Sequence, residues 1–254
     1  MPVINAIRSI LFNVVFYLFG IVFLSLIAMP TLLFKTEKQM RWAVGAFCRG
    51  SLFIARWVMG IKTEYRGLEN LPTEGGFILA AAHQSNMDPI MTYPVRGDVT
   101  ALAKKELFAM PLVGPALRKI NIVRIDRQSH NAHKDMKRVG EQVQEQARPL
   151  IVYPQATRVP IGQNKRLKSG AFHLYEDTGL PVVTVATNTG LFWGKGFWHR
   201  SGTAVFEVHP AFPQGLQKDE FMSRLQQDVV ERSRELVTEA GYGHLLPKTS
   251  DTKS

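Results

Sequence analysis

The residues with the clearest chemical potential are His83 and Asp88, which stand five positions apart in a turn of small polar residues. The turn follows an apolar run, Phe77–Ala82, whose length and composition are typical of a buried strand. Open α/β sheets bind ligands at the carboxyl ends of their strands, where we expect this turn to lie. An imidazole oriented by a carboxylate is the base of a nucleophilic triad, yet no serine in a strained nucleophile turn is evident nearby. We therefore expect the reacting hydroxyl to belong to the substrate.

The pair has a catalytic and a structural interpretation. If Nδ1 of His83 donates to Asp88, Nε2 is left as a base, which contributes roughly 10²–10⁴-fold to a rate. Alternatively, Asn86 or Asp88 caps a helix that has Pro89 in its first turn. The two interpretations are compatible, because a capping Asp88 can also hold His83.

Basic and hydroxyl side chains follow three other predicted strands. They are Lys105 after Val99–Ala103, Arg127 after Asn121–Ile125, and Thr157 with Arg158 after Leu150–Tyr153. Guanidinium and ammonium groups at such positions bind phosphate. Each position alone is equally consistent with a solvated helix start, a surface ion pair or a basic loop. Their recurrence at successive strand ends favours a site for an anionic group.

Strand-like and helical runs alternate from Ile61 onward. Two more strands are predicted over Val182–Thr187 and Thr203–Val208, and helices over Lys104–Met110, Ser129–Arg148, Ser169–Thr178 and Lys218–Ala240. This alternation predicts an α/β fold in which a mixed, mostly parallel sheet is flanked by helices. We expect the domain to cover residues 61–246, with a disordered tail over residues 247–254.

The first 60 residues have a different character. Ser9 to Phe34 is a run of 26 residues without Asp, Glu, Lys or Arg. About 20 apolar residues cross a bilayer, whereas the apolar region of a signal peptide has only about 7–15. We predict a retained membrane helix and, over Trp42–Met59, a second helix with Arg49 and Arg56 on one face. A hairpin within one leaflet and a span followed by a surface helix both fit residues 1–60.

Composition restricts the partners. The chain has 254 residues, a formal charge of +10 and a pI near 9.8, which suits nucleic acid, a membrane surface or phosphorylated substrates. Nucleic acid is not expected, because the long apolar run has no role in binding it. Cys48 is the only cysteine, and the other histidines lack ligand spacing, so we expect no disulfide and no metal.

An aromatic and glycine-rich segment, Leu191–His199, leaves two interpretations open. It could line the path of an acyl chain or reach the membrane interface, where Trp and Phe are common. It could equally be a packed loop.

Four motifs stand in an order that resembles a known family. They are His83 to Asp88 as a His-x4-Asp motif, Ile125–Arg127 as Phe-Ile-Asp-Arg, Tyr153–Arg158 as Phe-Pro-Glu-Gly-Thr-Arg, and Leu180–Val185 as Val-Pro-Val-x-Pro-Val. Between Ile61 and Pro213 the chain resembles the glycerolipid acyltransferase family, in particular its bacterial 1-acylglycerol-3-phosphate acyltransferases. A membrane segment ahead of the motifs also suits this family.

The resemblance implies a complete reaction. His83, held by Asp88, would deprotonate the 2-hydroxyl of 1-acyl-sn-glycerol 3-phosphate, which would attack an acyl thioester to give phosphatidate. The thioester would be acyl-CoA or acyl carrier protein, acting as a co-substrate, with no further cofactor and no metal. The phosphate would be bound by Arg158, Lys105, Arg127 and Thr157. Membrane lipids would be the partners, at the cytoplasmic face of a bacterial inner membrane.

The chain departs from the third motif at two positions. Gln155 replaces the family's Glu, and Ala156 replaces its Gly. Gln removes a negative charge, and Ala tolerates positive φ less well than Gly. We therefore predict an acceptor pocket at Gln155 and Ala156 that is retuned. Acylation of another lysophospholipid or of glycerol 3-phosphate is the alternative reaction, and a non-catalytic tether for anionic lipid is the alternative of another class.

Overall fold

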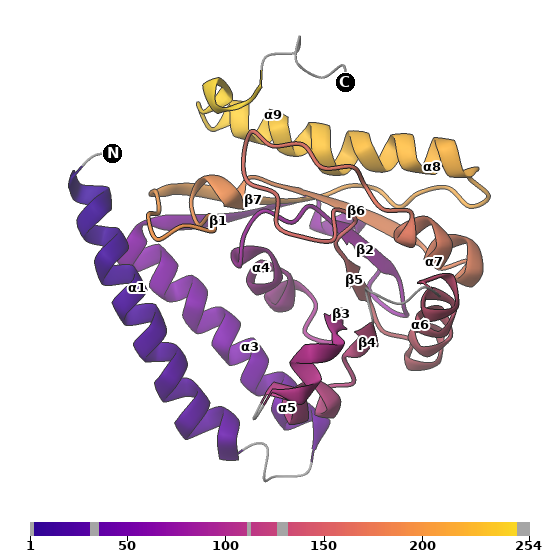
Figure 1. Ribbon diagram of the computed structural model, residues 1–254, viewed down its shortest axis with the longest axis horizontal. Coiled ribbons are helices and arrows are strands. Elements are labelled where there is room, and N and C mark those ends of the chain that lie inside the picture. Colours follow the sequence, from indigo (N-terminus) through magenta and orange to yellow (C-terminus); the bar gives the residue numbers. More distant parts are fainter. Residues whose placement is uncertain (1–2, 31–35, 111–112, 126–131, 248–254) are drawn as a thin grey trace.

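One seven-stranded sheet organises the computed structural model, which describes residues 3–30, 36–110, 113–125 and 132–247 (Figure 1). Its order is β1-β7-β6-β2-β5-β3-β4. The strands are β1 Ile61–Arg66, β2 Ile78–Ala81, β3 Thr100–Lys104, β4 Val123–Ile125, β5 Leu150–Val152, β6 Val182–Thr187 and β7 Gly202–Val208. Neighbours are parallel except β6 and β7. The predicted α/β fold with a mixed, mostly parallel sheet is confirmed, and the strand before His83 lies at its centre.

All six predicted strands occur, but two local predictions need correction and one strand was not predicted. Strand β4 begins at Val123 because Asn121 has a φ of 54°, which no strand residue adopts. The helix predicted over Lys104–Met110 is wrong, since β3 pairs with β4 through Lys104 and only a 3₁₀ helix, Lys105–Ala109, follows. Strand β1 was not expected, because this edge strand alternates charged and apolar residues over a short length.

Helices cover both faces of the sheet (Figure 1). After the N-terminal pair they are α4 Met87–Val95, α5 Val113–Lys119, α6 Ala132–Gln146, α7 Gly170–Thr178, α8 Lys218–Leu225 and α9 Arg232–Glu239. A π-helical turn, Gln226–Glu231, joins α8 and α9 into one C-terminal helix, as the apolar spacing predicted. Helix α4 begins after Asn86, but the Asn86 side chain makes no capping hydrogen bond, so this part of the capping interpretation is wrong. Residues 129–131 of the helix predicted over Ser129–Arg148 lie outside the described residues.

Strand β2 is buried on both faces, as parallel strands usually are. Phe77 and Leu79 point into a core shared with the N-terminal helices and α4. Ile78 and Ala80 point into a second core beneath α6, α7 and α8. Burying one such large apolar side chain contributes about 1.5–3 kcal/mol. The turn that begins at His83 is therefore anchored from two cores.

The two N-terminal helices form a hairpin along one side of the sheet (Figure 1). Helix α1, Val3–Phe23, extends through a π-helical turn to Ala28, and α3, Glu37–Ile54, extends in the same way to Met59. Their contact is aromatic: the rings of Phe19 and Phe47 stack at 5.6 Å. Residues 31–35, and residues 248–254 of the tail predicted over 247–254, lie outside the described residues.

The outer face of α1 is apolar along its length. Among the described residues, Val3–Ile27 is the one helix long and apolar enough to cross a membrane, with a mean hydropathy of 2.6 over its best 18-residue window. Only 11% of that window is buried. The most exposed apolar side chains of the hairpin are Val3, Ile4, Ile7, Tyr17, Ile21, Leu26, Phe53 and Trp57.

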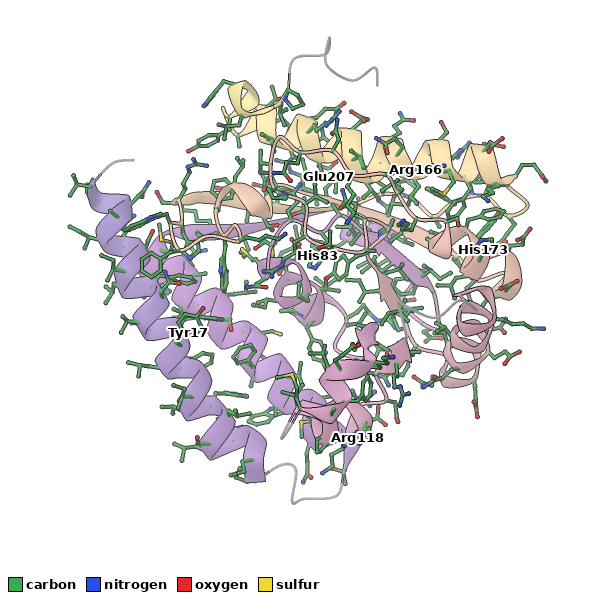
Figure 2. All side chains as sticks on the ribbon, viewed as in Figure 1. Tyr17, His83, Arg118, Arg166, His173 and Glu207 are labelled. Carbon is green, nitrogen blue, oxygen red and sulfur yellow. The ribbon has the colours of Figure 1, made fainter. Side chains whose placement is uncertain are left out.

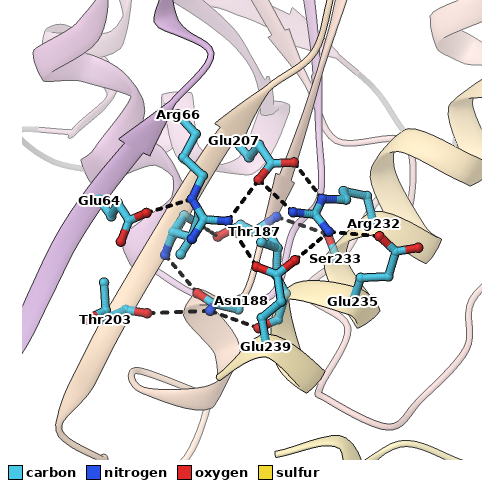
Figure 3. A network of polar contacts seen from close by, with 12 residues as sticks. Glu64, Arg66, Thr187, Asn188, Thr203, Glu207, Arg232, Ser233, Glu235 and Glu239 are labelled. Carbon is cyan, nitrogen blue, oxygen red and sulfur yellow. Dashed lines mark hydrogen bonds and ion pairs between the residues drawn. The ribbon is translucent and has the colours of Figure 1, made fainter. Parts of the chain in front are cut away.

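Ion pairs attach the C-terminal helix to the edge of the sheet (Figure 3). Glu207 on β7 accepts two hydrogen bonds from Arg232 of α9, at 2.6 and 3.0 Å, and one from Arg66 of β1 at 3.2 Å. The hydrogen bonds from Arg232 hold the pKa of the Glu207 carboxyl below its usual value. Glu235 reaches the same Arg232 from the solvent side.

Replacing Glu207 with Gln is expected to lower the free energy of unfolding by about 1–3 kcal/mol, because two guanidinium groups lose a shared anion. Since folding lowers this pKa, the stabilisation is present at neutral pH and is lost as the pH falls below the ordinary carboxyl range near 4.5. Thermal unfolding of wild type and variant across pH measures the difference. Glu235→Gln is the control, because an exposed pair contributes only about 0–1 kcal/mol. Equal losses from both variants would contradict this assignment.

Candidate active site

The turn after β2 holds the imidazole of His83 in one orientation. Its Nδ1 lies 2.9 Å from Oδ2 of Asp88, whose side chain is almost entirely buried. The same Oδ2 accepts the backbone N–H groups of Gln84 and Ser85, both at 2.8 Å. A carboxylate that accepts three such bonds keeps the proton on Nδ1, which leaves Nε2 as the nitrogen able to accept a proton. The predicted pair is therefore brought together, and Asp88 also ties the turn that precedes α4.

The other oxygen of Asp88 is held from a different strand. Oδ1 accepts a short hydrogen bond from the hydroxyl of Thr189, which lies just beyond β6. The adjacent Gly190 N–H donates to Oε1 of Gln84 at 3.1 Å. Strand β6 is the hydrogen-bonded neighbour of β2, so the two turns meet at the same edge of the sheet. Both oxygens of the buried carboxylate therefore accept hydrogen bonds.

The loop after β5 binds His83 from the side of β2 opposite to β6. Gln155 Oε1 accepts the His83 backbone N–H at 3.1 Å, and the Val159 N–H donates to the His83 carbonyl at 2.7 Å. The ring of Tyr153 stacks on the imidazole, with centroids 4.0 Å apart and planes inclined by 19°. Burial raises the pKa of Tyr153 well above its usual value, so this ring is neutral at physiological pH. These contacts fix the position and the plane of the imidazole.

Ala156 adopts a left-handed backbone conformation, at the position where the family motif has glycine. Its φ is 57°, and its N–H closes a tight turn onto the Tyr153 carbonyl at 2.8 Å. An L-residue in this region costs roughly 1–2 kcal/mol. The positive φ of Ala156 therefore lowers the stability of the folded state. The acceptor-pocket role predicted for Gln155 and Ala156 stays a prediction.

Arg158 reaches the same turn as His83. Its Nη1 donates to Oδ1 of Asn86 at 2.6 Å, which holds the guanidinium beside the His83 loop. Thr157 is exposed next to it. Lys105 begins the 3₁₀ helix after β3, at the same sheet edge but two strands away from β2. Arg127 lies outside the described residues. The phosphate-binding role of all four residues stays a prediction.

Comparison with known proteins places the chain in a family. A profile of the acyltransferase family matches residues 62–188. A 1-acyl-sn-glycerol-3-phosphate acyltransferase of Pseudomonas aeruginosa is 31% identical over 83% of this chain and 82% of its own length. The chain belongs to the acyltransferase family. The matched segment of this acyltransferase contains His83, Asp88 and Arg158, but it ends one residue before Thr189.

Two further comparisons extend the likeness to more distant proteins. The human 1-acyl-sn-glycerol-3-phosphate acyltransferase alpha is 26% identical over 93% of this chain and 86% of its own length. The crystal structure of the 1-acyl-sn-glycerophosphate acyltransferase PlsC of Thermotoga maritima superposes with a TM-score of 0.74 at 22% identity. It covers 91% of this chain and 97% of that protein. At this identity the likeness concerns the fold.

Two residues of the acyltransferase site escaped the sequence analysis. Thr189 stands two residues after β6, as His83 stands two residues after β2. The segment Thr187–Thr189 is neutral, so it lacks the charge that marks the other strand ends. Tyr153 belonged to a recognised motif, although its position within the motif did not indicate a ring stacked on His83. Among the described residues no group of three His, Cys, Asp or Glu side chains is placed to hold a metal ion.

Thr189 is expected to act as a positioning residue for Asp88. Thr189→Val removes a hydrogen bond to a buried anion, so kcat should fall about tenfold to hundredfold with little change in KM. Thr189→Ser keeps the donor and should recover most of the activity. Steady-state kinetics across pH measure the effect, because a tilted imidazole alters the profile whereas a merely structural role leaves it unchanged. A Val variant with wild-type kcat and pH profile would refute the role.

Proposed function

We propose that this acyltransferase moves a fatty acyl chain from an acyl thioester to the 2-hydroxyl of 1-acyl-sn-glycerol 3-phosphate, and so forms phosphatidate. The family membership supports acyl transfer, and the names of the similar proteins support this acceptor. The observation that carries the mechanism is the 2.9 Å contact between His83 Nδ1 and Asp88, with a Tyr153 ring that fixes the imidazole plane.

In the proposed reaction Nε2 of His83 removes the proton from the lipid hydroxyl as its oxygen attacks the thioester carbonyl. The ester C–O bond forms, the C–S bond breaks, and the proton on His83 passes to the departing thiolate. Asp88 keeps its proton acceptor role towards Nδ1 throughout and stabilises the transient imidazolium. The acceptor supplies the nucleophile, so the site needs no serine of its own. Acyl-CoA and acyl carrier protein are both suitable thioesters.

Binding of the acceptor is assigned to cations near the turn. Arg158 presents a guanidinium beside Asn86, and a guanidinium binds a phosphate through two parallel hydrogen bonds. Thr157, Lys105 and Arg127 are the proposed helpers. We propose that the exposed apolar face of α1 inserts in the membrane, where lysolipid and product reside, at the cytoplasmic face of a bacterial inner membrane.

Mass spectrometric identification of products tests the proposed acceptor. The purified protein is given a set of lysophospholipids and glycerol 3-phosphate, each with acyl-CoA and with acyl carrier protein. Phosphatidate from 1-acyl-sn-glycerol 3-phosphate should dominate. If another lysolipid is acylated preferentially, the proposed acceptor is wrong but acyl transfer from a thioester is retained. If no acceptor is acylated, the whole proposal is overturned.

His83→Ala is expected to lower kcat by about 10²–10⁴-fold, because the base that activates the hydroxyl is removed. Binding to phospholipid vesicles should be unchanged. His244→Ala is the matched control, since this exposed histidine lies in the last 3₁₀ helix and should retain full turnover. Turnover is followed by thiol release. A His83→Ala enzyme with normal kcat would exclude His83 as the base.

Arg158→Ala is expected to raise KM for the phosphate-bearing acceptor by about tenfold to hundredfold, the loss expected for a charge-assisted hydrogen bond, with a smaller change for the thioester. Arg166→Ala is the control on the same loop, because Arg166 is exposed and lies beside the C-terminal helix, away from His83 (Figure 2). Initial rates with each substrate varied in turn separate the two KM values. Equal increases for both substrates would assign Arg158 to folding or to the donor.

A further inference from the structure

The loop between β6 and β7 connects the catalytic turn to helix α1. At its start, the carbonyl of Trp193 accepts a short hydrogen bond from the hydroxyl of Ser85, which lies between His83 and Asp88. The buried Trp193 ring also packs edge-on against Phe12 and Phe16 of α1, at centroid distances of 4.8 and 4.9 Å. One residue thus touches both the His83 turn and the N-terminal hairpin.

The tip of the same loop is apolar and exposed. Phe197 and Trp198 are 51% and 55% exposed, and their rings contact each other at 5.0 Å. The tip is nevertheless held in place, because Asn13 of α1 donates to the Phe197 carbonyl at 2.9 Å. The His199 N–H donates to Ser9 of α1, also at 2.9 Å. Two large exposed aromatic side chains are therefore fixed beside the helix with the most exposed apolar face.

Basic groups surround this end of the hairpin. Lys195 is exposed within the loop, and Arg8 of α1 lies against Gly60 and Ser201. Arg56 lies 5.9 Å from the ring centroid of the exposed Trp57. Aromatic rings at headgroup depth with neighbouring cations are the arrangement that binds anionic lipid. The charge and the continuity with α1 favour a bilayer over a protein partner.

We propose that the tip formed by Phe197 and Trp198 inserts into the headgroup region of an anionic bilayer, as a membrane-binding element separate from the helical hairpin. The same loop holds Ser85 through Trp193, so lipid contact at the tip orients the catalytic turn. The inference rests on the membrane association proposed for α1. It goes beyond that association by assigning a second contact, from inside the catalytic domain.

An environment-sensitive dye attached at Trp198→Cys tests insertion without any assay of activity. Cys48 is the only native cysteine and is buried, so unsubstituted protein serves as the labelling blank. The control is the same dye at Asp219→Cys, an exposed position at the start of α8, far from α1 in Figure 1. Full-length protein is compared in lipid-free amphipol and in phosphatidylcholine vesicles with and without phosphatidylglycerol.

The dye at position 198 is expected to shift to the blue in vesicles, to shift further with phosphatidylglycerol, and to be quenched by lipids brominated near the headgroup. The dye at position 219 should do none of these. A dye at position 198 that stays as hydrated as the one at 219 would overturn the proposal, whichever lysolipid proves to be the acceptor.

Kinetics of the double variant Phe197→Ser/Trp198→Ser test the coupling to the turn. With lysolipid presented in phosphatidylglycerol vesicles, kcat/KM should fall about tenfold, which corresponds to tenfold weaker binding of the enzyme to the vesicles. With a short-chain, water-soluble acceptor and detergent-solubilised enzyme it should be unchanged. Phe53→Ser/Trp57→Ser, which removes two exposed aromatic rings from the second helix of the hairpin, is the matched control and should lose less in vesicles. Equal loss for both variants in vesicles would limit the tip to general hydrophobic anchoring and refute the coupling.

Discussion

The buried carboxylate of Asp88 is the interaction on which the site depends. Its two oxygens accept hydrogen bonds from the His83 ring, from the Gln84 and Ser85 backbone, and from the Thr189 hydroxyl. An isolated carboxylate would be costly in this position, because the side chain is almost fully removed from water. The charge is tolerated because every donor is aimed at it. The same donors fold the turn, so local structure and chemistry have one cause.

Three strands supply these groups because their ends meet at one edge of the sheet. Strand β2 lies between β6 and β5 and is parallel to both, so the turns after all three strands converge. The turn after β2 brings His83, the turn after β6 brings Thr189, and the loop after β5 brings Tyr153 and Arg158. The loop that leaves the β6 turn then reaches α1, which ties the N-terminal hairpin to the turn that carries the imidazole.

Much of this arrangement follows from local sequence. Apolar runs bounded by turn residues identified six of the seven strands, and polar residues after them marked the side of the sheet that carries His83, Arg158 and Lys105. The contact of Thr189 with Asp88 could not be predicted in this way, because it requires knowing that β6 pairs with β2. The stacking of Tyr153 on His83 depends on the same strand order. The positive φ of Asn121 also could not be predicted from the apolar pattern, whereas the family's Gly at position 156 pointed to the positive φ of Ala156.

The contact between Gln155 and His83 gives a physical reason for the replacement of Glu by Gln at position 155. The Gln155 carboxamide oxygen accepts the His83 N–H at the back of the turn, which a carboxylate would also do while adding a second charge near Asp88. Retaining the acceptor and omitting the charge leaves one anion to orient the imidazole.

The position of the proton on the His83 ring tests most directly whether Nε2 can act as the base. Nitrogen-15 spectra of the imidazole in the full-length enzyme, assigned by comparison with His83→Gln, distinguish the two neutral tautomers. The contact with Asp88 predicts that the neutral tautomer carries its proton on Nδ1 and leaves Nε2 bare. A ring protonated at Nε2 alone would contradict the central claim, because no base would then face the hydroxyl of the acceptor.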